Sequence, residues 1–229
     1  LFEIHGHMNL SAQLLPSLWY GSFNLLLILA LLIAWWHLDW RSLKADPGLQ
    51  HRFGFALVLL VCIWSLRAGV TDGLGIHFFM VTALHLVFGW QLAISAVVLV
   101  LLGLVWIGAE VWQGVGINGW VSGLVPILCT YGLWWWQQRI RLFNPFAFIF
   151  LVAFLGAALS VVASGLLMTL IYWGSNTHSL SILIAEYWLF VPLIALPEAT
   201  LNGILIAGLV VFKPEWVKLF DEQKYYGKL

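Results

Sequence analysis

The stretch TDGLGIHFFMVTALHLVFG, residues 71–89, carries polar side chains in an otherwise apolar part of the chain. His77 and His85 offer imidazole nitrogens and Asp72 offers a carboxylate, groups that can ligate a metal ion or exchange a proton. Spacing alone does not decide between these roles. For His85, a hydrogen bond to a carbonyl group across a helix interface is the alternative interpretation.

A second set of polar residues lies in equally apolar surroundings. Glu198 and Asn202, four residues apart, share one face of a helix, and Glu186 precedes them on the same apolar tract. Arg67 lies beside the first stretch and forms an ion pair with Asp72 in one interpretation. Asn118 follows a glycine-rich GVGI sequence that is typical of a loop before a helix start.

Composition places all these residues in a membrane protein. Of the 229 residues, 62% are hydrophobic and only 9% are charged, far from the average of soluble domains. A charged side chain at the centre of a bilayer costs at least roughly 2.5–3.5 kcal/mol, so each such residue is a functional candidate. The formal net charge of zero gives no support for nucleic acid as a partner. No nucleotide-binding loop or catalytic motif is visible, so we expect no enzyme, and Glu198 acting with His85 as an intramembrane enzyme has little support.

Charge and length together predict a polytopic all-α fold of one transmembrane domain spanning 1–229. Spans are expected at 18–38, 53–70, 119–137 and 146–173, and two longer tracts at 76–109 and 180–212. Apart from Arg67, the lysines and arginines form three groups, at 41–52, at 139–141 and at 213–228, and all three should face the cytoplasm. An even number of crossings must then separate the groups. The tract 76–109 should therefore be a hairpin turning near Gly89, and 180–212 one helix bent at Pro192 or Pro197. The result is about seven helices with the N-terminus outside and the C-terminus in the cytoplasm.

Three stretches, in order, resemble the CbiM/NikM family, the substrate-specific membrane components of energy-coupling factor transporters for cobalt and nickel. HFFMVTALHLVFGW has the family's histidine followed eleven residues on by Phe-Gly. GINGWVSGLVP is similar to the family's Gly-Ala-Asn segment that leads to a proline, and LPEATLNGILIAGLVVFKPEWV is similar to its final span. Together the three stretches cover roughly residues 60 to 217.

The resemblance implies a membrane permease that takes up a divalent transition-metal ion, cobalt or nickel or a similar ion such as copper, in the bacterial cytoplasmic membrane. In the family the ion is held near the outer surface by the N-terminal amine, a histidine directly after the initiating methionine, and a second histidine corresponding to His77. Nitrogen ligands suit these ions. We expect Asp72 and His85 to assist His77, with Glu198 or Glu186 compensating charge deeper in. A separate coupling membrane protein and ATPases are implied as partners, and Ala30 with Ala34 is a candidate docking face.

This sequence also departs from the family pattern. The GHM at 6–8 is typical of a cloning remnant, so either Met8 is the natural start and residues 1–7 are vector-derived, or those residues are native. In the first case Asn9 stands where the family has histidine. The segment around His77, IHFFM, is more apolar than in the family. The alternative function is therefore a non-transporting scaffold or accessory subunit of a larger membrane complex, with the fold kept and the metal lost.

Overall fold

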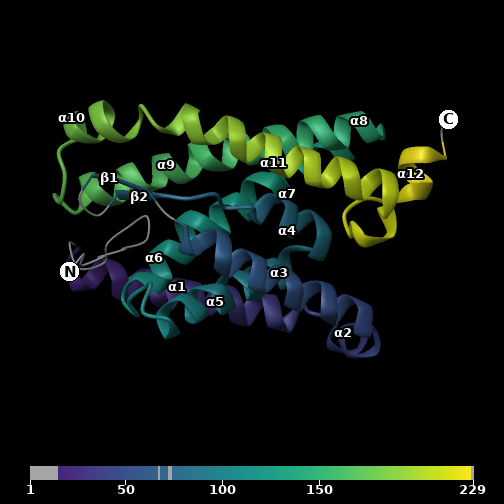
Figure 1. Cartoon of the computed structure of the whole chain (residues 1–229), viewed down its shortest axis with the longest axis horizontal. Coiled ribbons are helices and arrows are strands. Elements are labelled where there is room, and N and C mark those ends of the chain that lie inside the picture. The colour runs from purple at the N-terminus through teal and green to yellow at the C-terminus, as the bar shows by residue number, and fades with distance from the viewer. Residues whose placement is uncertain (1–14, 67, 72–73, 228–229) are drawn as a thin grey trace.

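Helices dominate the computed structural model, which describes residues 15–66, 68–71 and 74–227 (Figure 1). In chain order the helical segments are α1 (Ser17–Trp36), α2 (Trp40–Ala45), α3 (Pro47–Ser65), α4 (Val81–Phe88), α5 (Trp90–Trp106), α6 (Gly114–Gly119), a π-helical stretch (Trp120–Leu124), α7 (Val125–Arg139), α8 (Pro145–Ala147), a second π-helical stretch (Phe148–Leu155), α9 (Gly156–Gly174), α10 (Leu180–Ile182), a third π-helical stretch (Leu183–Tyr187), α11 (Val191–Phe212), a 3-10 turn (Pro214–Trp216) and α12 (Glu222–Tyr226). Four stretches in the described residues are long and apolar enough to cross a membrane, namely Ser17–Trp36, Pro47–Ser65, Pro145–Gly174 and Val191–Phe212. The prediction of a helical membrane protein is thus confirmed.

A small β-hairpin interrupts the helices where the sequence analysis expected the end of a span. β1 (Ala68–Thr71) pairs antiparallel with β2 (Leu74–Ile76), and α3 ends at Ser65, not at residue 70. The residues between the strands in sequence, Asp-Gly, are the pair most typical of tight hairpin turns, so the signal was present. Arg67 and Asp72 lie outside the described residues.

The glycine-rich sequence before Asn118 is helical, and its interpretation as a loop is wrong. The helix begins at Gly114 and continues through the π-helical stretch into α7. Gly116 explains why glycine is accepted here: a β-carbon at this position would overlap the backbone of Asn24 in α1. The N–H of Gly116 also donates to Oδ1 of Asn24 at 2.8 Å. Close packing of α6 on α1 outweighs the low helix propensity of glycine.

Both long tracts are interrupted, the first at the predicted glycine and the second by a turn where one bent helix was predicted. Gly89, with φ of 80°, separates α4 from α5, as the hairpin prediction required. The second tract breaks at 188–190, just ahead of Pro192, because proline is accommodated in the first turn of α11. Pro197 lies inside that helix.

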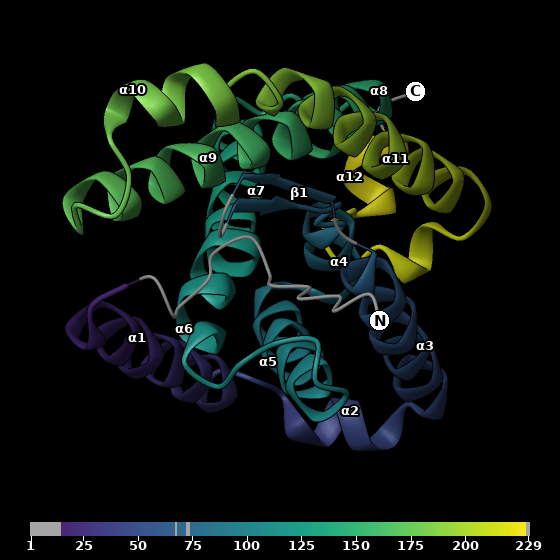
Figure 2. The ribbon, with the colours of Figure 1, turned by 60° about the vertical axis from the view of Figure 1, so that its left-hand side comes forward.

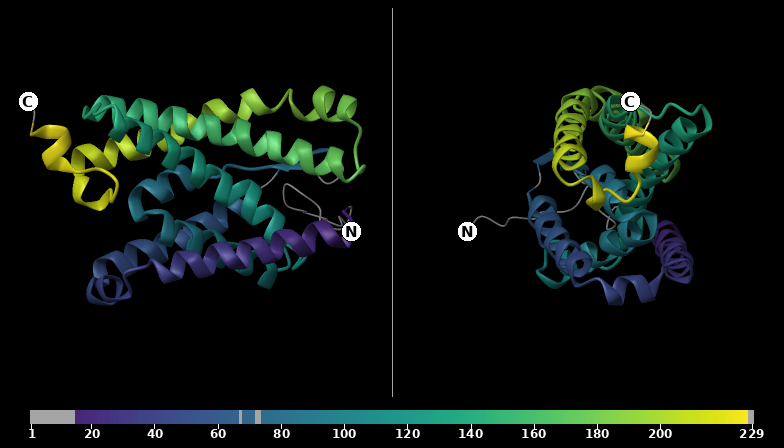
Figure 3. Two further views of the ribbon diagram at one scale, coloured as in Figure 1. Left: turned by 180° about the vertical axis from the view of Figure 1, so that it is seen from behind. Right: turned by 90° about the vertical axis from the view of Figure 1, so that its right-hand side faces the viewer.

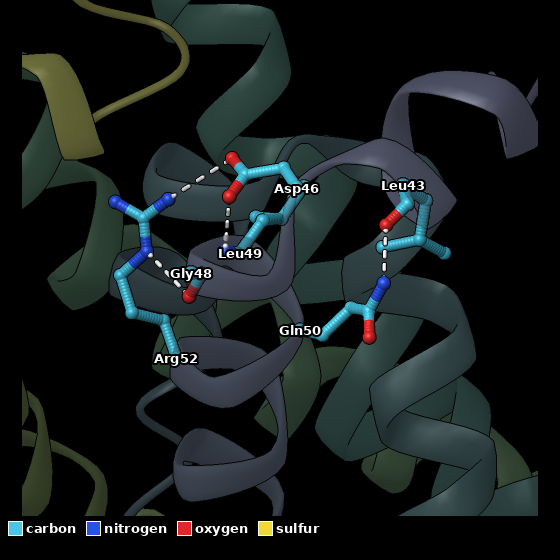
Figure 4. Close-up of polar contacts among 6 residues, drawn as sticks. All are labelled: Leu43, Asp46, Gly48, Leu49, Gln50 and Arg52. Atoms are coloured by element: carbon cyan, nitrogen blue, oxygen red, sulfur yellow. Dashed lines mark hydrogen bonds and ion pairs between the residues drawn. The ribbon is translucent and has the colours of Figure 1, made fainter.

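The three cationic groups gather at one end of the bundle, where α2, α8 and α12 lie in Figure 1. The guanidinium of Arg52 stacks on Trp216 at 4.8 Å and so joins the first group to the third. At the turn between α2 and α3, Asp46 accepts from the N–H of Leu49 at 2.9 Å and pairs with Arg52 at 3.5 Å (Figure 4). We call the end of the bundle that holds α2, α8 and α12 the charged end.

The eight-residue helix α4 lies inside the bundle, between α3, α7 and α11 (Figure 2). Every α4 residue except Val87 is buried. Seen from behind, α1 runs along one side of the molecule, opposite α9 and α11 (Figure 3). Ala34 of α1 is fully buried and Trp35 donates to Ser95 of α5 at 3.1 Å, so the Ala30/Ala34 face packs inside the chain and is not free for a partner.

Candidate functional site

Glu198 and Asn202 of α11 hold the start of α4. The Glu198 carboxylate accepts from the backbone N–H of Phe79 at 2.9 Å and of Met80 at 2.7 Å. Oδ1 of Asn202 accepts from the N–H of Ala83 at 2.8 Å, in the first turn of α4. The N–H groups of Met80, the N-cap residue, and of Ala83 are among those that a helix start leaves without intrahelical partners, and Phe79 directly precedes them. A carboxylate there is also favoured by the helix dipole, so Glu198 and Asn202 together act as an N-cap supplied by a distant segment.

The two side chains also fix each other. Nδ2 of Asn202 donates to Oε1 of Glu198 at 2.9 Å and to the Glu198 carbonyl oxygen at 2.7 Å. Both residues are fully or almost fully buried. The expectation that they share one helix face is confirmed. The Glu198 side chain is thus hydrogen-bonded to the segment that precedes α4.

The segment between β2 and α4 is non-helical, and the backbone groups of Phe79 and Met80 in it are hydrogen-bonded. Nε1 of Trp64 in α3 donates to the carbonyl oxygen of Phe79 at 3.1 Å. Met80 has the left-handed φ of 54°, and its carbonyl oxygen accepts from Leu84. Irregular backbone at membrane depth is tolerated only where protein groups or water pair with it. α3 and α11 supply that pairing from two sides.

His77 lies in this fixed segment. Its side chain is only 6% exposed, and its ring packs edge-on against Trp64 at 5.1 Å and Phe79 at 5.4 Å. The ring is therefore oriented by the same two residues whose hydrogen bond holds the backbone. Trp64, fully buried, was missed by sequence reasoning because tryptophan near a span end is usually an interfacial residue.

The structure does not bring His85 to His77. His85 lies near the other end of α4, with its ring 6.2 Å from Tyr131 of α7. It lines a pocket at the charged end, and none of the residues packed on the His77 ring contributes to that pocket. Glu186 is exposed on the π-helical stretch before α11. Among the described residues, no group of three or more His, Cys, Asp or Glu side chains is arranged to hold a metal ion.

Asn118 belongs to a separate polar cluster. Its Nδ2 donates to Oε2 of Glu110 at 3.2 Å, and Oε1 of Glu110 accepts from the N–H of Val111 at 2.9 Å. Sequence reasoning missed Glu110. The signal that could have found it is the presence of a carboxyl group eight residues before an asparagine in an apolar part of the chain. This cluster fixes the loop between α5 and α6.

Comparison with known proteins identifies the family. The sequence matches the CbiM family, described as "Cobalt uptake substrate-specific transmembrane region", over residues 9–216. The chain belongs to the CbiM family. No curated protein gives a match. A crystal structure of a "transition metal transporter" is similar in fold, with a TM-score of 0.69 and 14% identity over 88% of this chain and 92% of that one. A "Truncated Transition metal Transporter" has the same TM-score and identity, over 89% and 99%.

Membership confirms the resemblance carried by the three sequence stretches. Membership also makes the chain a membrane component of a metal-uptake system. Glu198 and Asn202 lie in the last of the three stretches and His77 in the first, so two of the stretches meet in the structure at the start of α4.

Proposed function

We propose that the chain is the substrate-specific membrane component of an energy-coupling factor type uptake system for a divalent transition metal such as cobalt, nickel or copper. The observation that carries the proposal is the position of His77 in a rigidly held, non-helical segment. That segment lies between the hairpin and α4, at the far end of α4 from the charged end. A nitrogen ligand placed in this way suits these ions. Asp72 is the proposed additional ligand, and His85 is left out because of its position.

The proposed topology has seven crossings, with the N-terminus outside and the C-terminus in the cytoplasm of a bacterial cell. The gathering of the three cationic groups at one end supports it, since the positive-inside rule then gives that end to the cytoplasm. The hairpin and His77 face the outside. A cation is captured there. Partner subunits, a coupling membrane protein and ATPases, supply the energy, because no nucleotide-binding motif is visible in this sequence.

Glu198 takes a different role from the one expected. Its carboxylate is engaged by two backbone N–H groups and Asn202, so we propose that it positions the His77 segment and does not ligate the ion. Charge compensation by Glu186 is not supported by any contact among the described residues.

The test is metal binding to the purified full chain, by calorimetry and elemental analysis with Ni²⁺, Co²⁺ and Cu²⁺. His77→Ala should lose most of the affinity, whereas His51→Ala should keep it, because His51 is exposed on α3 near the charged end. Equal binding by the two variants would refute the site.

The second candidate is the non-transporting scaffold. Glu198 is the most buried carboxyl group among the described residues, and its use in holding the backbone favours the scaffold. Wild-type protein that binds none of the three ions and co-purifies with a membrane partner would establish this alternative. Stoichiometric metal in the wild type would exclude it.

A further inference from the structure

A polar pocket of about 390 Å³ opens at the charged end of the bundle. Its walls come from the last turn of α4, the first turn of α5, α7 and the chain after α11. The part of the lining that Lys218 and Leu219 supply is fixed by backbone bonds, because their N–H groups donate to the carbonyl oxygens of Val87 and Leu86, each at 3.2 Å. The pocket is therefore a built feature of the fold.

His85 is the buried polar side chain of this pocket. Its exposed fraction is 0%, and within the described part of the chain neither ring nitrogen has a hydrogen-bond partner. Buried polar atoms in native proteins are nearly always paired, because an unpaired one is destabilising. Its place in the pocket lining makes a bound polar group the natural partner.

The first turn of α5 faces the same space. Gly89 is the N-cap of this 17-residue helix and provides no side-chain cap, and Trp90 and Gln91 line the pocket. The first N–H groups of such a helix lack intrahelical acceptors and, with the helix dipole, favour an anion. An added β-carbon at Gly89 would lie 3.2 Å from Nζ of Lys218, so the ammonium group sits over this turn.

The remaining charges leave the pocket positive. Asp221 is paired with Lys224 at 3.1 Å, and this pairing lowers the pKa of the Asp221 carboxyl group. Lys218 has no carboxylate partner in the described residues. A metal cation would be repelled by Lys218, whereas an anion would gain the ammonium group and the uncapped helix start together.

We propose that this pocket binds a phosphate group, that of an anionic phospholipid headgroup in the leaflet at the charged end. Trp90, Tyr131 and Trp134 form part of its wall, and tryptophan and tyrosine are enriched at headgroup level. Tyr131 is 40% exposed, so the wall opens towards the membrane beside α7. Basic pockets between membrane helices on the cytoplasmic side are suited to anionic headgroups. Free phosphate is the other source of the same chemistry. The proposal does not depend on the metal site.

The experiment measures lipid binding by native mass spectrometry of the full chain, with phosphatidylglycerol and phosphatidylethanolamine titrated separately. The wild type should prefer phosphatidylglycerol. Lys218→Gln should weaken phosphatidylglycerol binding about fivefold, the effect expected of one lysine near an anionic surface. Lys218→Arg should restore it. Lys44→Gln, which removes an exposed lysine of α2 at the same end, should leave it unchanged.

A second variant tests the buried side chain. His85→Leu should also weaken phosphatidylglycerol binding, and an unchanged gel-filtration profile shows that the variant folds. Inorganic phosphate that binds in a Lys218-dependent way, without a preference between the two lipids, would assign the pocket to free phosphate. Equal losses in Lys218→Gln and Lys44→Gln, or no binding of either phosphate source, would overturn the proposal.

Discussion

Replacing Glu198 by alanine should destabilise the protein more than any loss of a surface carboxyl group. The change leaves the backbone N–H groups of Phe79 and Met80 without their acceptor, while Asn202 keeps the Glu198 carbonyl oxygen. Each buried unsatisfied donor costs about 1–3 kcal/mol. Measured hydrogen bonds between membrane helices are weaker, averaging about 0.6 kcal/mol, because the unfolded state in the membrane finds other partners.

The two estimates bracket the expected loss. Hydrogen bonds from backbone donors to a charged acceptor at a helix start are closer in energy to the upper estimate. We therefore expect the free energy of unfolding to fall by about 3 kcal/mol. For a chain of this size about 1 kcal/mol corresponds to roughly 2–4 °C in Tm, which gives a shift of about 6–12 °C. Glu198→Gln keeps one acceptor oxygen and should show about half of that shift.

The assay is thermal unfolding of the detergent-purified protein, followed by tryptophan fluorescence. Glu186→Ala is the matched control, because Glu186 is an exposed glutamate shortly before the same helix. Its Tm should move by less than about 2 °C, as for ordinary surface substitutions. If Glu198→Ala and Glu186→Ala melt alike, the carboxylate does not cap α4 and the reasoning fails.

Three further experiments test the site and the packing of the fold. Trp64→Phe removes the donor to the Phe79 carbonyl oxygen and should cost about 1 kcal/mol in the same assay; no change would show that the bond is not needed. Gly116→Val places a side chain against the Asn24 backbone and should cost at least about 1–3 kcal/mol, whereas Gly54→Val, with open space around it, should cost less. Metal binding to the wild type should weaken from about pH 7.5 to pH 5.5, because protons compete for imidazole ligands. Calorimetry across this range checks it, and a flat profile would exclude histidine as a ligand.

Features that depend on local chemistry could be predicted from the sequence. Gly89 breaks the tract 76–109 because glycine alone adopts its positive φ easily, and a break there was required by the charge groups on either side. The common face of Glu198 and Asn202 follows from helical spacing. The family resemblance rested on three short stretches, and the family model matches a much longer range, residues 9–216.

Features that depend on distant contacts could not be predicted. The acceptor of the Phe79 N–H lies 119 positions away in sequence, and no local pattern marks a backbone group as the partner of Glu198. The helix at Gly114 was read as a loop because glycine propensity is measured without a neighbouring helix such as α1. His85 was grouped with His77 from proximity in sequence, but a two-turn helix places them at different ends.

The helix α4 is held at both ends by one continuous part of the chain, and this links the proposed metal site to the charged end. Eight residues are too few to form a stable helix alone. Glu198 and Asn202 of α11 bind its start, and the N–H groups of Lys218 and Leu219, just after α11, bind its last carbonyl oxygens. A displacement of α11 must therefore move α4 as a unit or break bonds at one of its ends. His77 precedes α4, and the polar pocket encloses the last turn of α4. A partner that shifts α11 at the charged end would therefore change the position of His77 without contacting that residue.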